Sequence, residues 1–277
     1  MKQPSQRLPK GDARPVVIHP TAIVAPEAQL GEGVEVGPYS IIGPHAAIGE
    51  GTVLGPHVFL QGRTTIGRDC QLSYGVVLGG EPQDDKYQGE PTEVIIGDRN
   101  RIREYVTIHR ATGEGQATRV GSDNLLMAYS HLGHNCEVGN SVMLASYAGM
   151  SGHTIIEDRV VIGGMVGSHQ KVRVGTLAMV SGYSKLVADV PPYMVADGRP
   201  ARVYGLNVVG LRRAGFSPAV RRSLQIAYKL LYRSNLNLSQ ALERWPSEVP
   251  DGEEVRYLFS FLERMRTASA CRSGAMH

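Results

Sequence analysis

This sequence of 277 residues is poor in aromatic residues and in cysteine. Phe, Trp and Tyr make up 6% of it and the hydrophobic residues 42%, so a core must be built mainly from aliphatic side chains. The cysteines Cys70, Cys136 and Cys271 are scattered and form no C-x-x-C motif. This pattern argues against a disulfide framework and favours free thiols in a reducing compartment. We therefore expect a cytoplasmic protein.

Long apolar runs and a strong excess of one charge are also missing. No stretch reaches the roughly 18 apolar residues of a membrane span, so we expect none. Residues 1–15 lack the apolar segment of a signal peptide and are expected to be a disordered leader, like the tail at 268–277. The net charge is only +3, but residues 199–233 hold eight cations and no Asp or Glu. Such a run favours an acidic partner over nucleic acid, because no array of stacking aromatics accompanies it.

What the sequence does have is a six-residue repeat. Stepping by six from Ile18 to Leu186, 25 of 29 positions are Ile, Leu, Val or Met, and Gly follows the aliphatic residue 13 times. This period fits neither an amphipathic helix nor an ordinary strand. It predicts a parallel β-helix over residues 16–190, in which three hexads form each coil and Gly turns the corners at positive φ.

Two segments interrupt the repeat and a third ends it. Residues 79–93 and 109–119 are rich in Gly, Pro and charge, and the repeat resumes in phase after each, so both are expected to be loops that carry function. Beyond Pro191-Pro192 the spacing becomes helical, with Ser217-Pro218 as a helix start. We expect a helical C-terminal domain over 191–267, with helices at 207–214, 218–233, 238–245 and 251–267.

Several motifs resemble one enzyme family closely. They are GEPQDDKYQGEPTEVIIGDRNRIREYVTIHRAT, VGSDNLLMAYSHLGHNCEVGN, IIGGMVGSHQ, DVPPYMVADG and GLNVVGLRRAGFS. Together they resemble the UDP-N-acetylglucosamine O-acyltransferases that begin lipid A biosynthesis, over roughly residues 16–235. The resemblance implies a left-handed coil, a homotrimer with sites between subunits, and transfer of a 3-hydroxy fatty acyl group from acyl carrier protein to the 3-position of UDP-N-acetylglucosamine. It implies no cofactor and no metal.

The resemblance also assigns roles to residues. His134 would be the general base and Gly152 the oxyanion donor. The residues expected to bind substrate are Asp84, Lys86, His131, His153, His169, Gln170, Gly182, Asn207 and Arg213, of which Gly182 would set the acyl chain length. Independently of the family, a sugar hydroxyl needs a base with a pKa near neutrality and a thioester needs an oxyanion site. No G-x-S-x-G nucleophile motif is present, so direct attack is favoured over an acyl-enzyme.

The sequence departs from the family pattern at three positions, and four alternative functions are considered. Asn135, Pro200 and Val209 stand where the family often has Asp, His and an acidic residue, which leaves the sugar and nucleotide contacts undecided. The alternatives are a β-helix metal hydratase of the carbonic-anhydrase type, a scaffold without catalysis, the neighbouring N-acyltransferase of the same pathway, and acyl transfer to a variant UDP-amino sugar. The hydratase would bind a metal through three His residues across subunits.

Overall fold

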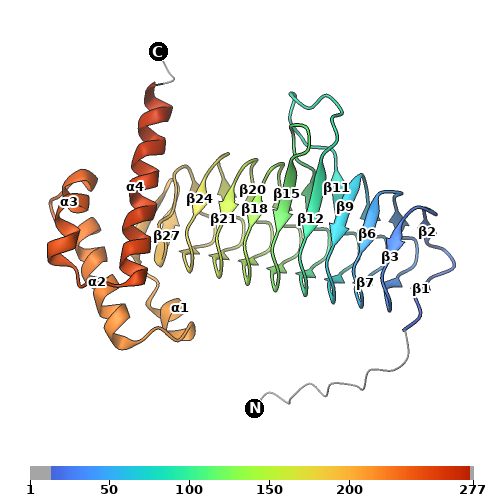
Figure 1. The fold of residues 1–277 in the computed structure, drawn as a ribbon, viewed down its shortest axis with the longest axis horizontal. Helices are drawn as coiled ribbons and strands as arrows, with labels where there is room; N and C mark the ends of the chain where they lie inside the picture. Colours follow the sequence, from blue (N-terminus) through green and yellow to red (C-terminus); the bar gives the residue numbers. More distant parts are fainter. Residues whose placement is uncertain (1–13, 275–277) are drawn as a thin grey trace.

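The structure, a computed structural model, describes residues 14–274, with side chains through Thr267. The chain winds into a long triangular prism of short parallel strands, with a group of helices packed at its C-terminal end (Figure 1). The parallel β-helix expected over residues 16–190 is therefore present. In the part of the chain that the structure describes, no helix combines the length and the apolar character needed to cross a bilayer.

Each face of the prism is one sheet. The first sheet contains β1 (Val17–Ile18), β4 (Glu35–Val36), β7 (Val53–Leu54), β10 (Gln71–Leu72), β13 (Arg101–Ile102), β16 (Leu125–Leu126), β19 (Met143–Leu144), β22 (Val161–Ile162), β25 (Met179–Val180), β27 (Met194–Gly198) and β28 (Ala201–Leu206). The second contains β2 (Ile23–Val24), β5 (Ile41–Ile42), β8 (Phe59–Leu60), β11 (Val77–Gly80), β14 (Thr107–His109), β17 (His131–Leu132), β20 (Gly149–Met150), β23 (Gly167–Ser168) and β26 (Lys185–Leu186). The third contains β3 (Gln29–Leu30), β6 (Ala46–Ile48), β9 (Arg63–Ile66), β12 (Glu93–Ile96), β15 (Ala117–Val120), β18 (Glu137–Val138), β21 (Ile155–Ile156) and β24 (Arg173–Val174).

The aliphatic residue of each hexad points into the prism. Ile42 pairs in register with Leu60, eighteen residues later, and both are almost fully buried. A second inward position lies four residues after the aliphatic one and holds small side chains, such as Val58, Cys70 and Cys136. Burying each large aliphatic side chain contributes about 1.5–3 kcal/mol, so the stacked hexads build one continuous core. The free thiols Cys70 and Cys136 belong to this core.

The glycines that follow the aliphatic residues serve a different purpose from the one expected. The expectation that they turn the corner at positive φ holds at Gly79, where φ is 75°, but is wrong elsewhere, because positive φ occurs two residues later, as at Tyr39, His57 and Gly33. The repeat glycines are required by space: a Cβ at Gly49 would lie 2.6 Å from the carbonyl carbon of Gly67 in the next coil. Consecutive coils thus approach too closely at this point for any side chain.

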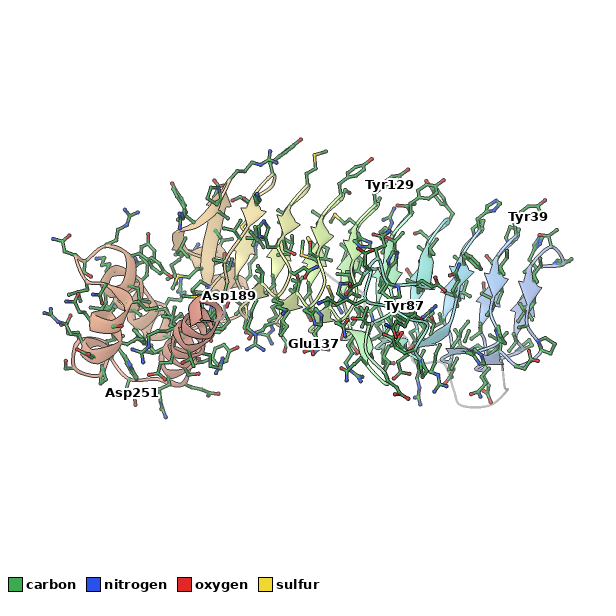
Figure 2. The ribbon with its side chains drawn as sticks, turned by 90° about the horizontal axis from the view of Figure 1, so that it is seen from above. Tyr39, Tyr87, Tyr129, Glu137, Asp189 and Asp251 are labelled. Carbon is green, nitrogen blue, oxygen red and sulfur yellow. The ribbon has the colours of Figure 1, made fainter. Side chains whose placement is uncertain are left out.

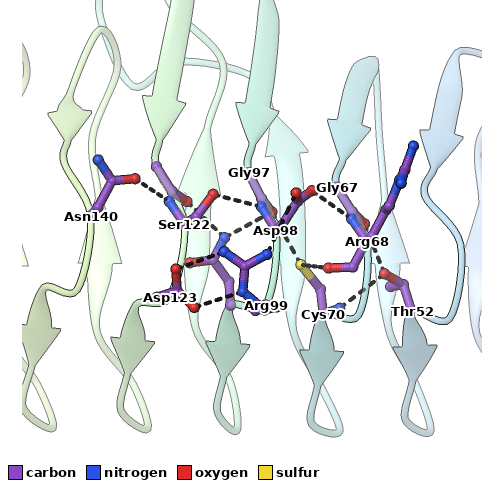
Figure 3. Close-up of polar contacts among 12 residues, drawn as sticks. Thr52, Gly67, Arg68, Cys70, Gly97, Asp98, Arg99, Ser122, Asp123 and Asn140 are labelled. Atoms are coloured by element: carbon purple, nitrogen blue, oxygen red, sulfur yellow. Dashed lines mark hydrogen bonds and ion pairs between the residues drawn. The ribbon is translucent and has the colours of Figure 1, made fainter. Parts of the chain in front are cut away.

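Polar side chains tie the coils together where the chain passes from the third sheet to the first. Asp98 Oδ1 accepts a hydrogen bond from the Arg68 N–H, and Ser122 Oγ accepts one from the Asp98 N–H (Figure 3). Arg99 and Asp123 add a bidentate pair between coils, with both distances at 2.8 Å. These bonds satisfy backbone donors that the sheet ladders leave free, so this corner is rigid.

Tyrosines line the corner between the first and second sheets. Tyr105, Tyr129 and Tyr147 stack with centroid separations of 5.0 Å, and Tyr74 packs edge-on against Tyr105. We call this row the tyrosine edge; its members are Tyr39, Tyr74, Tyr105, Tyr129, Tyr147 and Tyr183. All are exposed, and Figure 2 shows Tyr39 and Tyr129 projecting from the same side of the prism, with Glu137 on another.

Both loops leave the prism where the chain passes from the second sheet to the third, which we call the site corner. They are shorter than expected, because β11 continues through Gly80, β12 begins at Glu93 and β15 takes residues 117–120 in pairing with β12. The loops therefore comprise residues 81–92 and 110–116. They bind each other, since Glu90 Oε1 accepts from the Gly113 N–H at 2.8 Å.

The C-terminal part contains four helices, as expected: α1 (Val208–Arg213), α2 (Pro218–Tyr232), α3 (Leu238–Glu248) and α4 (Glu253–Gly274). The Ser217-Pro218 helix start is confirmed, with Ser217 Oγ accepting from Val220 N–H. Two expectations are wrong. The domain begins with the antiparallel pair β27–β28, which extends the first sheet, and α4 continues past residue 267 to Gly274. Residues 1–13 and 275–277 of the expected leader and tail lie outside the described residues.

Candidate active site

The site corner brings together three of the expected residues by repetition alone. His134, Gly152 and Gln170 each stand two residues after the inward aliphatic position, in three successive coils. Equivalent positions in adjacent coils lie about 4.8 Å apart, so the three are immediate neighbours. They share a pocket of about 310 Å³, which is lined by Gln83, His109, His131, Gly133, His134, Gly149, Met150, Ser151, Gly152 and Gln170.

His134 has a polar neighbour at each end of its imidazole. Its side chain is only 6% exposed. Nδ1 lies 2.9 Å from Asn135 Oδ1, while Nε2 lies 3.7 Å from Asp84 Oδ2 on the first loop. The second distance is too long for a hydrogen bond. Nε2 thus faces the pocket with a carboxylate beyond it, an arrangement suited to accept a proton from a bound hydroxyl.

Gly152 lies directly against the His134 ring. A Cβ at this position would be 2.2 Å from Nε2, so no other residue fits without moving the imidazole. Among the described residues, no oxygen accepts a hydrogen bond from the Gly152 N–H. An unpaired N–H beside a candidate base is what an oxyanion site requires.

Two further histidines form the wall of the pocket. His131 Nδ1 lies 2.7 Å from Thr107 Oγ1, and its ring meets His109 edge-on at 5.0 Å. Burial, with a smaller contribution from His109, lowers the pKa of His131 to about 4. Burial also lowers the pKa of His109, whose Nδ1 is buried without a partner in the described residues. Both rings are therefore neutral near pH 7 and can donate or accept hydrogen bonds. His109 was missed in the sequence because its strand is followed by a loop that hides its place in the repeat.

The first loop is anchored over the pocket by a buried arginine. Arg110, 11% exposed, donates to Gly79 O at 2.6 Å and to the Tyr87 hydroxyl at 3.1 Å. Within the loop, Asp84 Oδ1 accepts from the Lys86 N–H at 3.1 Å. Asp84 thus reaches His134, while the Lys86 side chain remains exposed.

The remaining expected site residues are divided between the pocket rim and distant places. The His153 ring packs edge-on against His134 at 5.2 Å, and its pKa is lowered by burial and by His134. His169 is exposed and does not line the pocket. Gly182 lies next to the tyrosine edge; Asn207 caps the N-terminus of α1 and Arg213 is its last residue, beyond the last coil (Figure 1).

The side chain of Asn207, which is expected to bind the nucleotide, already has partners within the chain. Its side chain caps α1 by accepting from Gly210 N–H, and donates to Leu177 O at 2.8 Å, so its polar atoms are engaged inside the protein. Arg213, by contrast, is exposed at the end of α1. One chain therefore does not bring Gly182, Asn207 and Arg213 to His134.

A larger groove of about 600 Å³ lies on the outer face of the third sheet, beside Tyr257 of α4. It is lined by no histidine, and Tyr257 uses its hydroxyl to bind Glu157, so we place the candidate site in the smaller pocket. Residues 14–267 contain no group of three or more His, Cys, Asp or Glu arranged to hold a metal ion.

Comparisons with known proteins identify the family. Residues 189–271 match the family described as UDP N-acetylglucosamine O-acyltransferase, domain 2. The acyl-[acyl-carrier-protein]–UDP-N-acetylglucosamine O-acyltransferase of Paraburkholderia phymatum is 51% identical over 252 residues, covering 89% of this chain and 96% of that protein. Its counterpart in Burkholderia lata is 56% identical over 225 residues, covering 81% and 86%. The chain belongs to this family.

Solved structures agree with the assignment of this acyltransferase. LpxA from Acinetobacter baumannii superposes with a TM-score of 0.86 at 40% identity, covering 90% of this chain and 97% of that one. The Arabidopsis UDP-N-acetylglucosamine acyltransferase gives 0.78 at 32% identity, covering 88% and 95%. The expected fold class, a left-handed parallel β-helix with a C-terminal helical part, is confirmed. Family membership favours an acyltransferase over a metal hydratase or a scaffold without catalysis.

Proposed function

We propose that this protein transfers a 3-hydroxy fatty acyl group from acyl carrier protein to the 3-hydroxyl of UDP-N-acetylglucosamine, the first step of lipid A biosynthesis. The observation that carries the proposal is the pocket in which His134 Nε2 faces both Asp84 and the free Gly152 N–H. The names of the relatives supply the substrate classes, and the pocket supplies a base and an oxyanion donor for joining them.

The reaction is a direct acyl transfer. His134 Nε2 removes the proton of the sugar hydroxyl as its oxygen attacks the thioester carbonyl carbon. The resulting oxyanion accepts a hydrogen bond from the Gly152 N–H. The C–S bond then breaks, and the leaving sulfur takes the proton back from the imidazolium, which yields the ester and the free thiol of the carrier. No acyl-enzyme is formed.

The groups around His134 bind the sugar. Asp84, 3.7 Å from Nε2, accepts a hydrogen bond from a neighbouring sugar hydroxyl, and Lys86 and Gln170 contact the sugar from the rim. His131 lines the pocket and His153 lies at its rim, both as neutral donors, consistent with their lowered pKa values. His169 lies further out and meets the acyl group or the pantetheine of the carrier.

A neighbouring chain completes each site. Gly182, Asn207 and Arg213 lie away from the His134 pocket of their own chain, so their roles require a neighbouring chain. Arg213 binds the nucleotide diphosphate, and Asn207 positions α1 for this contact through its capping bonds. The tyrosine edge has exposed fractions from 43% to 62%, and its rings from Tyr74 to Tyr147 contact one another, so it is suited to burial between chains.

The acyl chain lies along the open groove that ends near Gly182. A Cβ at Gly149 or Gly167, which continue the row of His131 along the second sheet, would meet nothing within 4 Å, so the wall beside the base is free of side chains. Gly182 leaves the far end open as well. Each buried methylene contributes about 0.8 kcal/mol, so acyl chains on the order of twelve to fourteen carbons should be preferred.

The experiment is a transfer assay with UDP-N-acetylglucosamine and a panel of acyl carrier proteins loaded with chains of different length and hydroxylation. Mass spectrometry should detect one acyl ester per sugar. The wild type should prefer the longer acyl chains, and Gly182→Met should prefer shorter ones. With the 3-amino analogue offered in parallel, transfer to that analogue alone, which gives an amide, would assign a 3-amino sugar instead. Absence of any acylated nucleotide sugar with every carrier would contradict the proposal.

A further inference from the structure

The second loop makes an unusual set of contacts with the residue after the candidate base. Asn135 Oδ1 accepts hydrogen bonds from the Thr112 N–H at 2.9 Å and the Thr112 hydroxyl at 3.0 Å. Asn135 Nδ2 donates to Thr112 O at 3.0 Å. The same Oδ1 lies 2.9 Å from His134 Nδ1. The backbone N–H and carbonyl of Thr112 therefore both bind the Asn135 amide, which in turn contacts the His134 imidazole.

These contacts allow only one orientation of the Asn135 amide. A backbone N–H can only donate and a backbone carbonyl can only accept, so the Thr112 N–H must face Oδ1 and the Thr112 carbonyl must face Nδ2. Flipping the amide would bring Nδ2, a donor, against the Thr112 N–H, and Oδ1, an acceptor, against the Thr112 carbonyl. The atom facing His134 is consequently an oxygen, which can only accept.

We propose that Thr112, acting through Asn135, fixes the tautomer of His134 with its proton on Nδ1 and its lone pair on Nε2. This inference rests on the proposed function, in which Nε2 is the base. A free neutral imidazole distributes its proton between both nitrogens, and the proton must be absent from Nε2 for this nitrogen to accept one. Thr112 and Asn135 are thus positioning residues, because neither lies on the reacting atoms.

The orientation of Asn135 depends on contacts of the two loops, and no charged group lies at His134 Nδ1. Thr112 is held in place because the neighbouring Gly113 N–H donates to Glu90 and the Gly115 N–H donates to Pro91 O at 2.9 Å. The charged and titratable groups around His134 are otherwise Asp84 at Nε2, His153 edge-on to the ring, and His109. None of them contacts Nδ1, so the neutral amide alone determines which nitrogen carries the proton.

The backbone of Asn135 permits a clean set of variants. Its φ is 57°, a conformation that Asn, Asp and Gly adopt readily. Asn135→Gly removes the amide without straining this corner. Asn135→Asp keeps an acceptor at Nδ1 but adds a negative charge and loses the bond to Thr112 O. Thr112→Ala is the matched control, since it removes only the hydroxyl and leaves both backbone contacts.

The first measurement is nitrogen NMR of the trimer with ¹⁵N-labelled histidine rings, assigned with His134→Gln. Wild type and Thr112→Ala should show a protonated Nδ1 and an unprotonated Nε2 for His134, and Asn135→Gly should show a mixture. This readout needs no substrate, so it remains valid if acyl transfer itself is not detected. A wild-type His134 protonated at Nε2 would overturn the proposal.

The second measurement is the pH profile of transfer. Asn135→Gly should lower kcat by about tenfold or more while KM changes little, because the productive tautomer becomes a minor species. Asn135→Asp should retain most of kcat but move the acidic limb of kcat/KM upward by about one pH unit, since a carboxylate stabilises imidazolium. Wild-type kcat and an unshifted profile in both variants, with the folded trimer intact, would show that Asn135 only packs the corner.

Discussion

At the scale of single residues, two of the imidazoles that line the pocket, His109 and His131, are kept neutral by burial. His131 is the clearest case, since burial lowers its pKa from 6.5 to about 4. An ionised His131 would place a positive charge beside the half-buried ring of His109, with which it forms the edge-on pair. The neutral ring instead keeps its bond to Thr107 and offers a polar edge to the substrate.

This burial predicts a loss of stability in mild acid. The folded pKa of His131 lies below the unfolded value, so the unfolded chain binds more protons between about pH 6.5 and 4, and stability falls as the pH is lowered through this window. His131→Asn, which retains a polar atom near Thr107, should therefore show a smaller decrease in Tm between pH 7.5 and pH 5 than the wild type. Thermal unfolding at both pH values measures it; an equal or larger decrease would contradict a neutral His131.

The candidate-site residues that the sequence predicts occupy recognisable positions in the repeat or in a loop, whereas those it misses do not. His134, Gly152 and Gln170 fall on one repeat position, and Asp84 lies on an obvious loop, so their proximity could be anticipated. The contact between Thr112 and Asn135 could not, because a loop of 110–116 has no periodicity to place its backbone. The same holds for the capping bonds that occupy Asn207, since polarity alone does not show whether a side chain points inward.

At the scale of elements, the coils are limited by the distance between their backbones. Gly49 illustrates this, because its added Cβ would contact both the carbonyl carbon and the oxygen of Gly67 at 2.6 and 2.7 Å. At Gly205 in β28, by contrast, an added Cβ would meet nothing within 4 Å.

We therefore expect Gly49→Ala to lower the free energy of unfolding by about 1–3 kcal/mol, through forced separation of two coils. Gly205→Ala should change it by less than about 0.5 kcal/mol and serves as the control, since both substitutions add the same methyl group. Urea unfolding followed by circular dichroism compares them. Similar losses in both variants would mean that the spacing of the coils is not what requires the repeat glycines.

Helix α2 carries part of the basic run and is the element we expect to attract the carrier. Arg222 and Lys229 are exposed on it, two turns apart, whereas Arg221 is half-buried with its Nε unpaired in the described residues. Acyl carrier protein is strongly acidic, so this surface should raise its rate of association.

Charge reversal at Arg222 and Lys229 should weaken carrier binding and flatten its dependence on salt, while affinity for the nucleotide sugar stays near normal. The control is reversal of Arg63 and Arg119, exposed on the third sheet, which changes the net charge equally. Calorimetric titration of each double variant with acyl carrier protein and with the nucleotide sugar, at two salt concentrations, compares the α2 pair with the control pair. Equal effects of the two pairs, or loss of nucleotide binding, would remove α2 from this role.

Elements were predicted well where the hexads run and less well after them. The strands repeat one pattern, so each supports the next, and the in-phase return of the repeat located both loops. The β27–β28 hairpin was missed because its segment departs from the hexad frame and its pairing is antiparallel. The last turns of α4 were missed because residues 268–274 lack a clear apolar stripe.

At the scale of the whole molecule, the proposed function requires an assembly of about 90 kDa, three times the 30.0 kDa chain. If the tyrosine edge lies between chains, placing carboxylates on it should separate them. Tyr129→Glu with Tyr147→Glu should therefore yield monomers in light scattering, whereas Arg63→Glu with Arg119→Glu should remain trimeric. A fully active wild-type monomer, or a trimer unaffected by the tyrosine changes, would contradict this interface.

We propose that His134 of one chain acts together with Arg213 of a neighbouring chain. His134→Ala should lower kcat by roughly 10²–10⁴, the usual effect of losing a positioned base, and Arg213→Ala should abolish nucleotide binding.

Co-expression of these two inactive variants in equal amounts shows whether the site is shared between chains. In any mixed trimer one interface joins an intact His134 to an intact Arg213, so random assembly should restore about one quarter of the wild-type activity. The recovered activity should show wild-type KM for the nucleotide sugar, because each restored site is complete. Mixed trimers that remain as inactive as the separate variants would place both residues within one chain and contradict the shared site.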